Sequence, residues 1–310
     1  MRVVVALGGN ALSPLRSDGS VEQMRVALDV AAEVLAALVE AGTSLVLTHG
    51  NGPQVGRLLL QQELAAAEVP PMPMDVCGAL SQGQLGYLVA QALDNALRRR
   101  RLETRVLSLV TQVVVGGRDP AFRRPSKPVG PSYERSVAQA ISHASGHVFA
   151  IQPDGRWRRV VASPKPLRFV EEGPLLALVE SGHVVVAAGG GGVPVVEHRG
   201  QLRGVEAVVD KDRTAALLAS AVGADVLLIL TEVAQVQVGF GTPHARALSS
   251  VSVSQARQLL ASGEFPDGSM GPKVEACLTF VEAGGRAAIG ALSDASAVLA
   301  GHTGTWFTSG

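Results

Sequence analysis

The sequence predicts an α/β fold: a three-layer αβα sandwich with a mainly parallel open sheet and a small inserted, protruding subdomain. Short β-branched runs alternate with longer Ala- and Leu-rich stretches along the chain, as in sheets whose parallel strands are joined by helices. The runs are apolar almost without alternation, which is typical of strands covered on both faces. One segment rich in Pro, Arg and Gly, at about 116–166, breaks this pattern and is too long for a loop in a compact domain.

The expected elements follow one another along the whole chain. Strands are expected at 3–7, 44–48, 105–110, 184–188, 226–231 and 287–289, and helices at 21–41, 54–68, 81–100, 173–181, 213–222, 254–261 and 273–283. The segment at 116–166 contains short β-like pieces at 147–152 and 157–161, which indicate a subdomain able to act as a lid. We therefore expect an N-terminal lobe at 1–200, which includes this subdomain, and a C-terminal lobe at 201–310.

The composition argues against several classes of protein. The formal net charge is zero, so no electrostatic field favours nucleic acid or an anionic membrane surface. No stretch approaches the roughly 18 apolar residues of a membrane span, and the first apolar run leads into glycines, like a strand rather than a signal peptide. Cys77 and Cys277 are too few and too far apart for a disulfide framework or a zinc cluster. We expect a cytoplasmic protein that binds neither nucleic acid nor membranes.

Lysine is rare in this chain. Only Lys127, Lys165, Lys211 and Lys273 occur, and the other 23 of the 27 basic residues are arginine. A lysine ammonium is compact and sits on a flexible stem, whereas a guanidinium is a broad planar fork. A site that places one small cation against one phosphoryl oxygen needs lysine, so the count suggests a phosphoryl-transfer site. The alternative is a compositional bias toward arginine that left four lysines by chance.

Glycine clusters mark the places where such a site would bind anions. They lie at 8–10, 50–52 and 189–192 after predicted strands, and at 268–271 before a predicted helix. Glycine lets backbone N–H groups approach an anion, and a helix N-terminus adds a favourable dipole. The clusters after the first two strands share the carboxyl edge of the sheet, where open α/β sheets bind their ligands. Neither a P-loop nor a dinucleotide fingerprint occurs, so the phosphates must be held in another way.

A charged triplet, Asp210-Lys211-Asp212, leads a predicted helix. Two flanking carboxylates keep an ammonium charged and oriented, although a helix cap alone explains Asp212. Lys273 also lies at the start of a helix, and cations at two helix starts suggest a shared polyanion such as a triphosphate. Phosphoryl transfer needs in-line positioning and charge neutralisation, which lysines, backbone N–H groups and Mg²⁺ supply. His49, beside the second glycine cluster, is either structural or catalytic.

Taken in order over the whole chain, these motifs resemble those of the carbamate kinases in the amino-acid kinase superfamily. The matching stretches are ALGGNAL (6–12), THGNGPQVG (48–56), ALSQGQLGY (79–87), VTQV (110–113), DPAFRRPSKPVGP (119–131), SPKP (163–166), GGGGVPVV (189–196), GVEAVVDKD (204–212), FGTP (240–243) and GSMGPKVEA (268–276). The resemblance implies the amino-acid kinase fold, a homodimer, and reversible phosphoryl transfer between carbamoyl phosphate and ADP with Mg²⁺. This reaction gives ATP and carbamate and belongs to arginine catabolism.

The resemblance also implies roles for individual residues. The catalytic residues would be three lysines, one of them on the protruding subdomain, and a carboxylate that organises the lysines: Lys127, Lys211, Lys273 and Asp210. Backbone amides around the transferred phosphoryl group would come from Gly8, Gly9, Asn10, Gly50, Asn51 and Gly52. The nucleotide would be bound by Lys211, Thr231, Gln237, Met270, Gly271 and Lys273. The resemblance assigns no role to Lys165 and no metal held by the protein alone.

The segment after the predicted strand at 226–231 departs from the family pattern, which often reads LTDVDxVY. Glu232 replaces an Asp, Ala234 removes a second acid, and Gln237 replaces an aromatic residue expected near adenine. The phosphate motifs are thus intact and the base pocket is altered. Two alternatives to a carbamate kinase stay open: a related acyl-phosphate or amino-acid kinase of the same fold with a different acceptor, and a non-catalytic nucleotide-binding paralogue.

Overall fold

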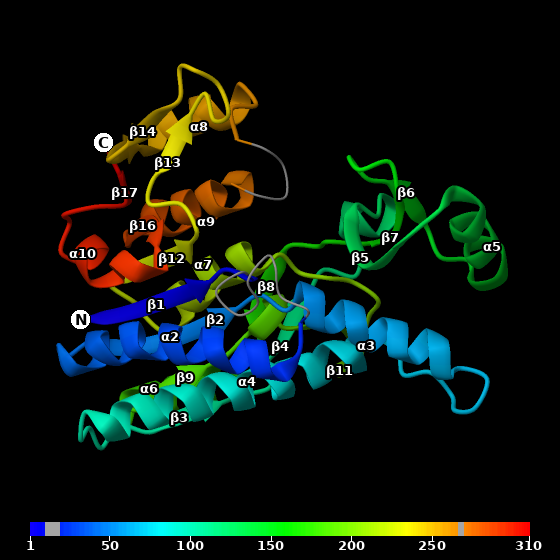
Figure 1. Cartoon of the computed structure of the whole chain (residues 1–310), viewed down its shortest axis with the longest axis horizontal. Coiled ribbons are helices and arrows are strands. Elements are labelled where there is room, and N and C mark those ends of the chain that lie inside the picture. The colour runs from blue at the N-terminus through cyan, green and yellow to red at the C-terminus, as the bar shows by residue number, and fades with distance from the viewer. Residues whose placement is uncertain (10–18, 266–269) are drawn as a thin grey trace.

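The computed structural model describes residues 1–9, 19–265 and 270–310. Within them, the centre of the molecule is an eight-stranded sheet with the strand order β15-β17-β16-β12-β1-β2-β9-β3 (Figure 1). All its pairs are parallel except β16 with β17, which confirms the predicted mainly parallel sheet. Its strands are β1 (Arg2–Leu7), β2 (Ser44–His49), β3 (Val106–Ser108), β9 (Val184–Val186), β12 (Val226–Thr231), β15 (Ser250–Ser252), β16 (Arg286–Ala291) and β17 (Thr305–Thr308).

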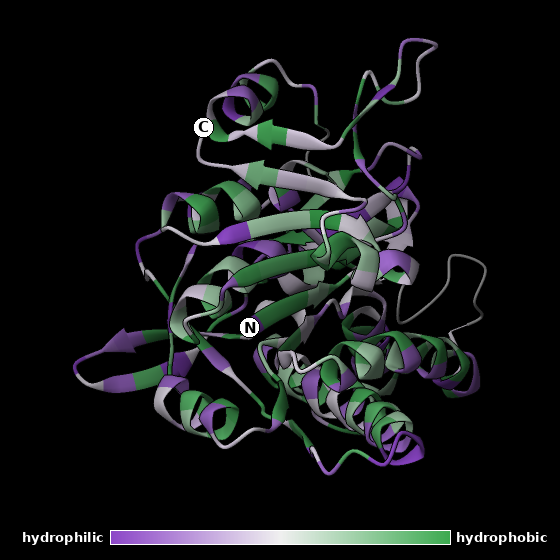
Figure 2. Cartoon of the chain, turned by 90° about the vertical axis from the view of Figure 1, so that its left-hand side faces the viewer, coloured by the Kyte–Doolittle hydropathy of each residue, from purple (hydrophilic) through white to green (hydrophobic). Residues whose placement is uncertain are grey.

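Helices cover both faces of this sheet, because successive residues of each strand point to opposite sides. Val3, Val5 and Leu7 of β1 pack toward α2 (Val21–Glu40), α4 (Met74–Arg99) and α10 (Ala295–Leu299). Val4 and Ala6 pack toward the other layer, which is formed by α6 (Glu172–Glu180), α7 (Lys211–Ala221), α8 (Val253–Ala261) and α9 (Met270–Glu282). Figure 2 shows the hydrophobic strands between helices whose outer faces are hydrophilic. The predicted three-layer sandwich is therefore confirmed.

The predicted insertion forms a separate body that protrudes from the sandwich (right-hand side of Figure 1). It has a three-stranded sheet, in the order β5-β7-β6, and one helix. A small apolar cluster that includes Val55, Leu59, Val129 and Val161 joins it to α3 (Gly52–Ala65). The elements of the insertion are β5 (Lys127–Tyr133), α5 (Arg135–Ser145), β6 (Phe149–Ile151) and β7 (Trp157–Val161).

A second sheet, in the order β11-β10-β4-β8, forms the base of the insertion. The chain leaves toward the insertion from β4 (Gln112–Val115) through η1 (Pro120–Arg123) and returns in β8 (Pro166–Phe169), which pairs antiparallel with β4. Ala162, just after β7, also bridges to Ala207. This bridge ties the insertion to the segment that leads into α7. The remaining strands of the sheet are β10 (Val193–His198) and β11 (Gln201–Gly204).

Some predicted boundaries were wrong. Helix α4 begins at Met74, not at residue 81; its first turns carry Gly78 and directly follow the proline-rich segment 70–73, and both features argue against a helix in the sequence. Helix α9 begins at Met270 rather than 273, with Pro272 in its first turn, where proline is tolerated. The second sheet and the short strands β13 (Val236–Val238) and β14 (Arg246–Leu248) were not predicted. Every helix in the described ranges is too short or too polar to cross a membrane.

Candidate active site

Four chain turns meet at one edge of the central sheet, where β12, β1, β2 and β9 end next to one another. The N–H of Gly8 donates to Leu230 O at 3.0 Å, and the N–H of Gly50 donates to Leu7 O at 3.2 Å. A Cβ atom on Gly50 would lie 3.5 Å from Gly9 Cα. The first two predicted glycine clusters are therefore in contact, while Asn10, the last residue of the first cluster, lies outside the described residues.

The third glycine cluster packs against the second one. It forms η2 (Gly189–Gly191), in which Gly190 has a φ of 67°, in the left-handed region that favours glycine. A Cβ atom on Gly190 would lie 2.1 Å from the Asn51 side chain, and one on Gly189 would lie 2.5 Å from the His49 ring. Close approach of two turns, rather than flexibility, therefore requires these glycines.

His49 lies beneath the turns and not in the pocket. Its side chain is buried, and its Nδ1 is 3.0 Å from Gly50 O. Burial lowers the pKa of His49 to about 4, and the Gly50 carbonyl opposes this shift. A ring that stays neutral near pH 7 and is covered by Gly189 supports packing, so the geometry favours the structural interpretation of this residue.

The central feature of the site is a carboxylate shared by two lysines. Asp212 Oδ1 lies 2.6 Å from Lys211 Nζ, and Asp212 Oδ2 lies 3.1 Å from Lys273 Nζ. The Asp212 side chain is only 4% exposed, and a buried charge of this kind persists only when it is paired. The contact with Lys273 joins the first turns of α7 and α9, and the contact with Lys211 lies within α7. The thiol of Cys277, buried nearby, has its pKa raised by desolvation and by Asp212, so it stays protonated.

The third lysine belongs to a second ion pair on the insertion side. Lys127 Nζ lies 2.8 Å from Asp210 Oδ2, and Asp210 is the N-cap of α7, since it accepts from the N–H groups of Asp212 and Arg213. Burial raises the pKa of Asp210, but the Lys127 ammonium, the Asp212 N–H and the Lys211 charge outweigh burial and hold the pKa below its usual value. Asp210 therefore fixes both the helix start and the lysine of the insertion.

The roles of the two aspartates in the structure differ from those that the sequence predicted. Asp210 was expected to organise the lysines and Asp212 to be an ordinary cap. In the structure Asp210 is the cap and organises Lys127, while Asp212 organises Lys211 and Lys273. The triplet did contain a signal for this arrangement. A helix needs only one aspartate as its N-cap, so the second aspartate is available to pair with a distant cation.

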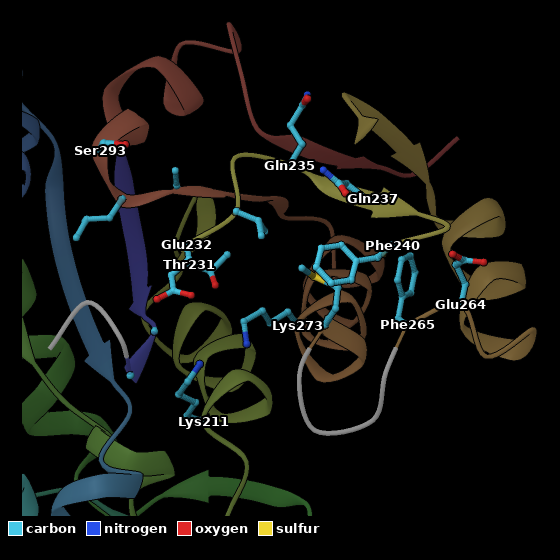
Figure 3. A pocket seen from close by; sticks show the side chains of 16 residues that line it. Lys211, Thr231, Glu232, Gln235, Gln237, Phe240, Glu264, Phe265, Lys273 and Ser293 are labelled. Carbon is cyan, nitrogen blue, oxygen red and sulfur yellow. The ribbon is translucent and has the colours of Figure 1, made fainter. Parts of the chain in front are cut away.

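A pocket of about 680 Å³ opens above Lys211 and Lys273 (Figure 3). Of the residues predicted on the phosphate and nucleotide sides, it is lined by Gly8, Gly9, Lys211, Thr231, Gln237, Met270 and Lys273. Gly271 is buried in the first turn of α9 instead. Gly52 begins α3, and Lys127 begins β5 of the insertion, outside the lining of this pocket. The structure thus brings the first glycine turn and most of the predicted nucleotide residues to one cavity, and the turn at 50–52 packs against the first turn outside the cavity lining.

Two aromatic residues that the sequence analysis did not assign form one wall of this pocket. Phe240 is 67% exposed although it is large and apolar, and it lies beside the buried Phe265 and below Gln237 (Figure 3). An exposed aromatic face on a pocket wall is suited to stacking against a flat ring. The FGTP motif contained Phe240, but only the tertiary structure places it opposite the lysines.

Oxygen ligands for a cation are few in this pocket. Among the described residues, no group of three or more His, Cys, Asp or Glu side chains is arranged to hold a metal ion. Thr231 and Glu232, at the end of β12, place a hydroxyl and a carboxylate on the pocket wall (Figure 3). This donor set fits Mg²⁺ that arrives with a nucleotide, because Mg²⁺ usually takes one or two protein oxygens and obtains the rest from phosphates and water.

Comparison with known proteins agrees with this geometry. A model of the amino acid kinase family matches residues 1–289, and the chain therefore belongs to the amino acid kinase family. The predicted fold and enzyme class, a phosphotransferase, are confirmed by this match.

Relatives that match nearly the whole chain are named carbamate kinase. The carbamate kinase of Pyrococcus horikoshii is 44% identical over 310 residues, which cover 99% of both chains. That of Thermococcus kodakarensis is 46% identical over 309 residues, 98% of both chains. The structure of carbamate kinase from Giardia lamblia bound to AMP-PNP has a TM-score of 0.94 at 38% identity and covers 99% of this chain and 98% of that one. The resemblance inferred from the motifs is thus confirmed.

Neutral His49 makes stability depend on pH in a defined direction. Its pKa is about 4 in the folded chain and 6.5 as a free side chain, so its contribution is complete above about pH 6.5 and is lost as the pH falls toward 4. Between pH 7 and pH 5, the free energy of unfolding measured with urea should fall by about 1–2 kcal/mol more in wild type than in His49→Gln. His198→Gln, at an exposed histidine, is the control and should behave like wild type. An equal loss in wild type and His49→Gln would contradict the assignment.

Proposed function

We propose that this chain is a carbamate kinase, which transfers a phosphoryl group reversibly between carbamoyl phosphate and ADP and gives ATP and carbamate. One observation carries the proposal: the shared carboxylate of Asp212 holds Lys211 and Lys273 at the pocket, directly beside the glycine turns. Relatives that are 42–46% identical over nearly the whole chain and carry the name carbamate kinase support it.

The residues have separate tasks in this mechanism. A β-phosphate oxygen of ADP attacks the phosphorus of carbamoyl phosphate, and the bond from phosphorus to the carbamate oxygen breaks. Charge on the moving group and on the leaving oxygen must be neutralised, and little covalent help is needed. Lys211 and Lys273 supply two ammonium groups on the nucleotide side. The N–H groups of Gly9, Asn51 and Gly52 bind the transferred group and the carbamoyl end, because those of Gly8 and Gly50 already donate to carbonyls of the neighbouring strands.

Lys127 is assigned to the carbamoyl phosphate side of the same site. It is the first residue of β5, and its strand is tied to the core through β7 and the bridge from Ala162 to Ala207. Together, Lys127, Lys211 and Lys273 face two carboxylates, Asp210 and Asp212. The cluster therefore keeps one excess positive charge, which favours binding of an anionic substrate.

Mg²⁺ is proposed to enter with the nucleotide and to be held mainly by phosphate oxygens, with Thr231 and Glu232 as the protein side chains nearest to it on the pocket wall. When bound, the ion neutralises phosphate charge and withdraws electrons from the phosphoryl oxygens.

The two lobes are proposed to bind different substrates: the lobe at 1–200 binds carbamate and the phosphoryl group, and the lobe at 201–310 binds the nucleotide. A cytoplasmic location is proposed because both cysteines are free and buried.

A homodimer is proposed through the exposed face of α4 and the edge strand β3. Val76, Leu80 and Tyr87 are exposed at helical spacing on α4, and Leu107 is exposed on β3. Strand β3 is the last strand of the eight-stranded sheet, so its outer edge is unpaired within the described chain. An apolar helix face next to an open sheet edge is a typical interaction surface, because both its side chains and its backbone groups gain partners on association.

Arginine is expected to fail where the mechanism needs a lysine. Lys211→Arg and Lys273→Arg should each lower turnover by roughly 10²-fold or more, as for loss of one preorganised charge contact, because a guanidinium is a broad planar fork and cannot place one compact cation at the same point against a phosphoryl oxygen. The measurement is a coupled assay of ATP formed from ADP and carbamoyl phosphate, run beside acetyl phosphate. Lys165→Arg is the matched control, since the Lys165 side chain is exposed and its backbone N–H contacts Asp119.

The same assay tests the proposed function itself. Formation of ATP from carbamoyl phosphate at a higher kcat/KM than from acetyl phosphate is expected. Preference for acetyl phosphate would favour a related acyl-phosphate kinase, and absence of turnover with either would favour a non-catalytic paralogue. Turnover of both arginine variants within a few-fold of wild type would contradict the assigned roles of the lysines.

The base end of the pocket gives a prediction about nucleotide affinity. Phe240→Ala should weaken ADP binding about tenfold, because stacking of an aromatic side chain on a base contributes roughly 1–3 kcal/mol. Gln237→Tyr should tighten ADP binding, because it adds an aromatic face on the same wall. Calorimetric titration with ADP measures both. If Phe240→Ala binds ADP like wild type, the base does not stack on Phe240.

The proposed dimer is tested by molar mass in solution. Wild type should elute as a dimer at micromolar concentration in size-exclusion chromatography with light scattering. The double variant Leu80→Glu with Tyr87→Glu should become monomeric, because it buries charges against an apolar face. Ile151→Glu, at a residue of the insertion that is 62% exposed, is the control. A wild-type monomer, or a dimer that survives the double substitution, would rule out this interface.

A further inference from the structure

Asn51 is placed as the N-cap of α3 but does not act as one. Its side chain makes no capping hydrogen bond, and Pro53 follows within the first turn. A capping side chain accepts from the second or third N–H of its helix. Because proline has no N–H, the N–H of Gln54 is the group that Asn51 is positioned to cap. Asparagine is among the best N-cap residues, so something must hold its side chain away.

Ser81 of α4 holds that side chain. Asn51 Nδ2 donates to Ser81 Oγ at 2.7 Å, and Ser81 Oγ donates its own proton to Gly78 O at 2.7 Å. Since the proton of Ser81 is committed to Gly78, its oxygen is left to accept, and this fixes the amide nitrogen of Asn51 toward α4. Ser81 is fully buried, so water does not compete for these two hydrogen bonds.

The other side of the Asn51 side chain is closed by the third glycine turn. The closest atoms to a Cβ on Gly190 would all belong to the Asn51 carboxamide, at 2.1–2.3 Å. The glycine turn at 189–192 is also fixed to α4, through Thr111. The Gln82 side chain accepts from the Thr111 N–H at 2.9 Å, and Thr111 Oγ1 accepts from the Ala188 N–H at 3.1 Å. Asn51 is therefore confined between α4 and the turn.

We propose that Ser81 is a positioning residue, which keeps the Asn51 side chain from capping α3 and so leaves the N–H of Gln54 open to the anionic oxygens of carbamoyl phosphate. The inference rests on the proposed function, since it deepens the role of the turn at 50–52. Without Ser81, the carboxamide of Asn51 would turn to the N–H of Gln54 and compete with the substrate for the amino end of the helix. Ser81 itself does not touch the substrate.

Steady-state kinetics of Ser81→Ala test this arrangement. The KM for carbamoyl phosphate should rise roughly three- to tenfold, the range that one hydrogen bond accounts for, while the KM for ADP should stay within twofold. Ser220→Ala is the matched control: its hydroxyl also donates to a carbonyl of its own helix, that of Ala216, but it accepts from no substrate-turn residue. Both KM values of the control should equal those of wild type.

A double-mutant cycle with Asn51→Ala separates positioning from general disturbance. If Ser81 acts through Asn51, the change Ser81→Ala should add no further rise in the KM for carbamoyl phosphate when residue 51 is already alanine. A full additional rise would overturn the proposal. If Ser81→Ala does not fold, Ser81→Cys replaces it, because sulfur is a weak acceptor of similar shape, and it should raise the same KM.

A crystal structure of Ser81→Ala gives the direct readout, in which Asn51 Oδ1 should accept from the Gln54 N–H. An Asn51 side chain that keeps its position against Gly190, or an unchanged KM for carbamoyl phosphate in an active enzyme, would overturn the proposal and leave the carbamate kinase assignment intact. Wild type without turnover of carbamoyl phosphate and ADP would instead overturn the assignment itself.

Discussion

The ion pair that Asp212 shares between Lys211 and Lys273 is the interaction on which the rest of the site depends. Lys211 is the neighbour of Asp212 in α7, so the carboxylate can bind a second ammonium group only because the first turn of α9 brings Lys273 to the start of α7. Removing the carboxylate would leave two cations close together in a partly buried site, which is costly. With it, the lysines are held in place before any substrate arrives, and electrostatic preorganisation of this kind is usually a large part of catalysis.

The parallel sheet supplies the frame for this ion pair. Because β12, β1, β2 and β9 run parallel and lie side by side, their carboxyl ends bring Thr231, Gly8, Gly50 and the turn at 189–192 together. The turns pack closely enough that Gly189 and Gly190 have no room for a side chain. The same packing excludes His49 from chemistry, since it covers the ring and keeps it neutral.

The insertion contributes Lys127 to the site from outside the sandwich. Its lysine reaches the core at Asp210, the residue that also caps α7, so the position of Lys127 is coupled to the start of the helix that presents Lys211. The apolar contacts with α3 and the bridge at Ala207 fix the insertion on two sides. Helix α4 links these parts to the proposed dimer face, because Ser81 and Gln82 point inward while Leu80 is exposed.

The sequence alone determined the layer architecture, the insertion, the family and the identities of the lysines, because apolar periodicity, glycine turns and ordered motifs are local properties of the chain. It did not determine which aspartate pairs with which lysine, the neutral state of His49, or the aromatic wall made by Phe240 and Phe265. Those depend on contacts between residues such as Asp212 and Lys273, 61 positions apart, and on burial. Only the folded sheet and its flanking helices decide which side chains meet and how far water is excluded from them.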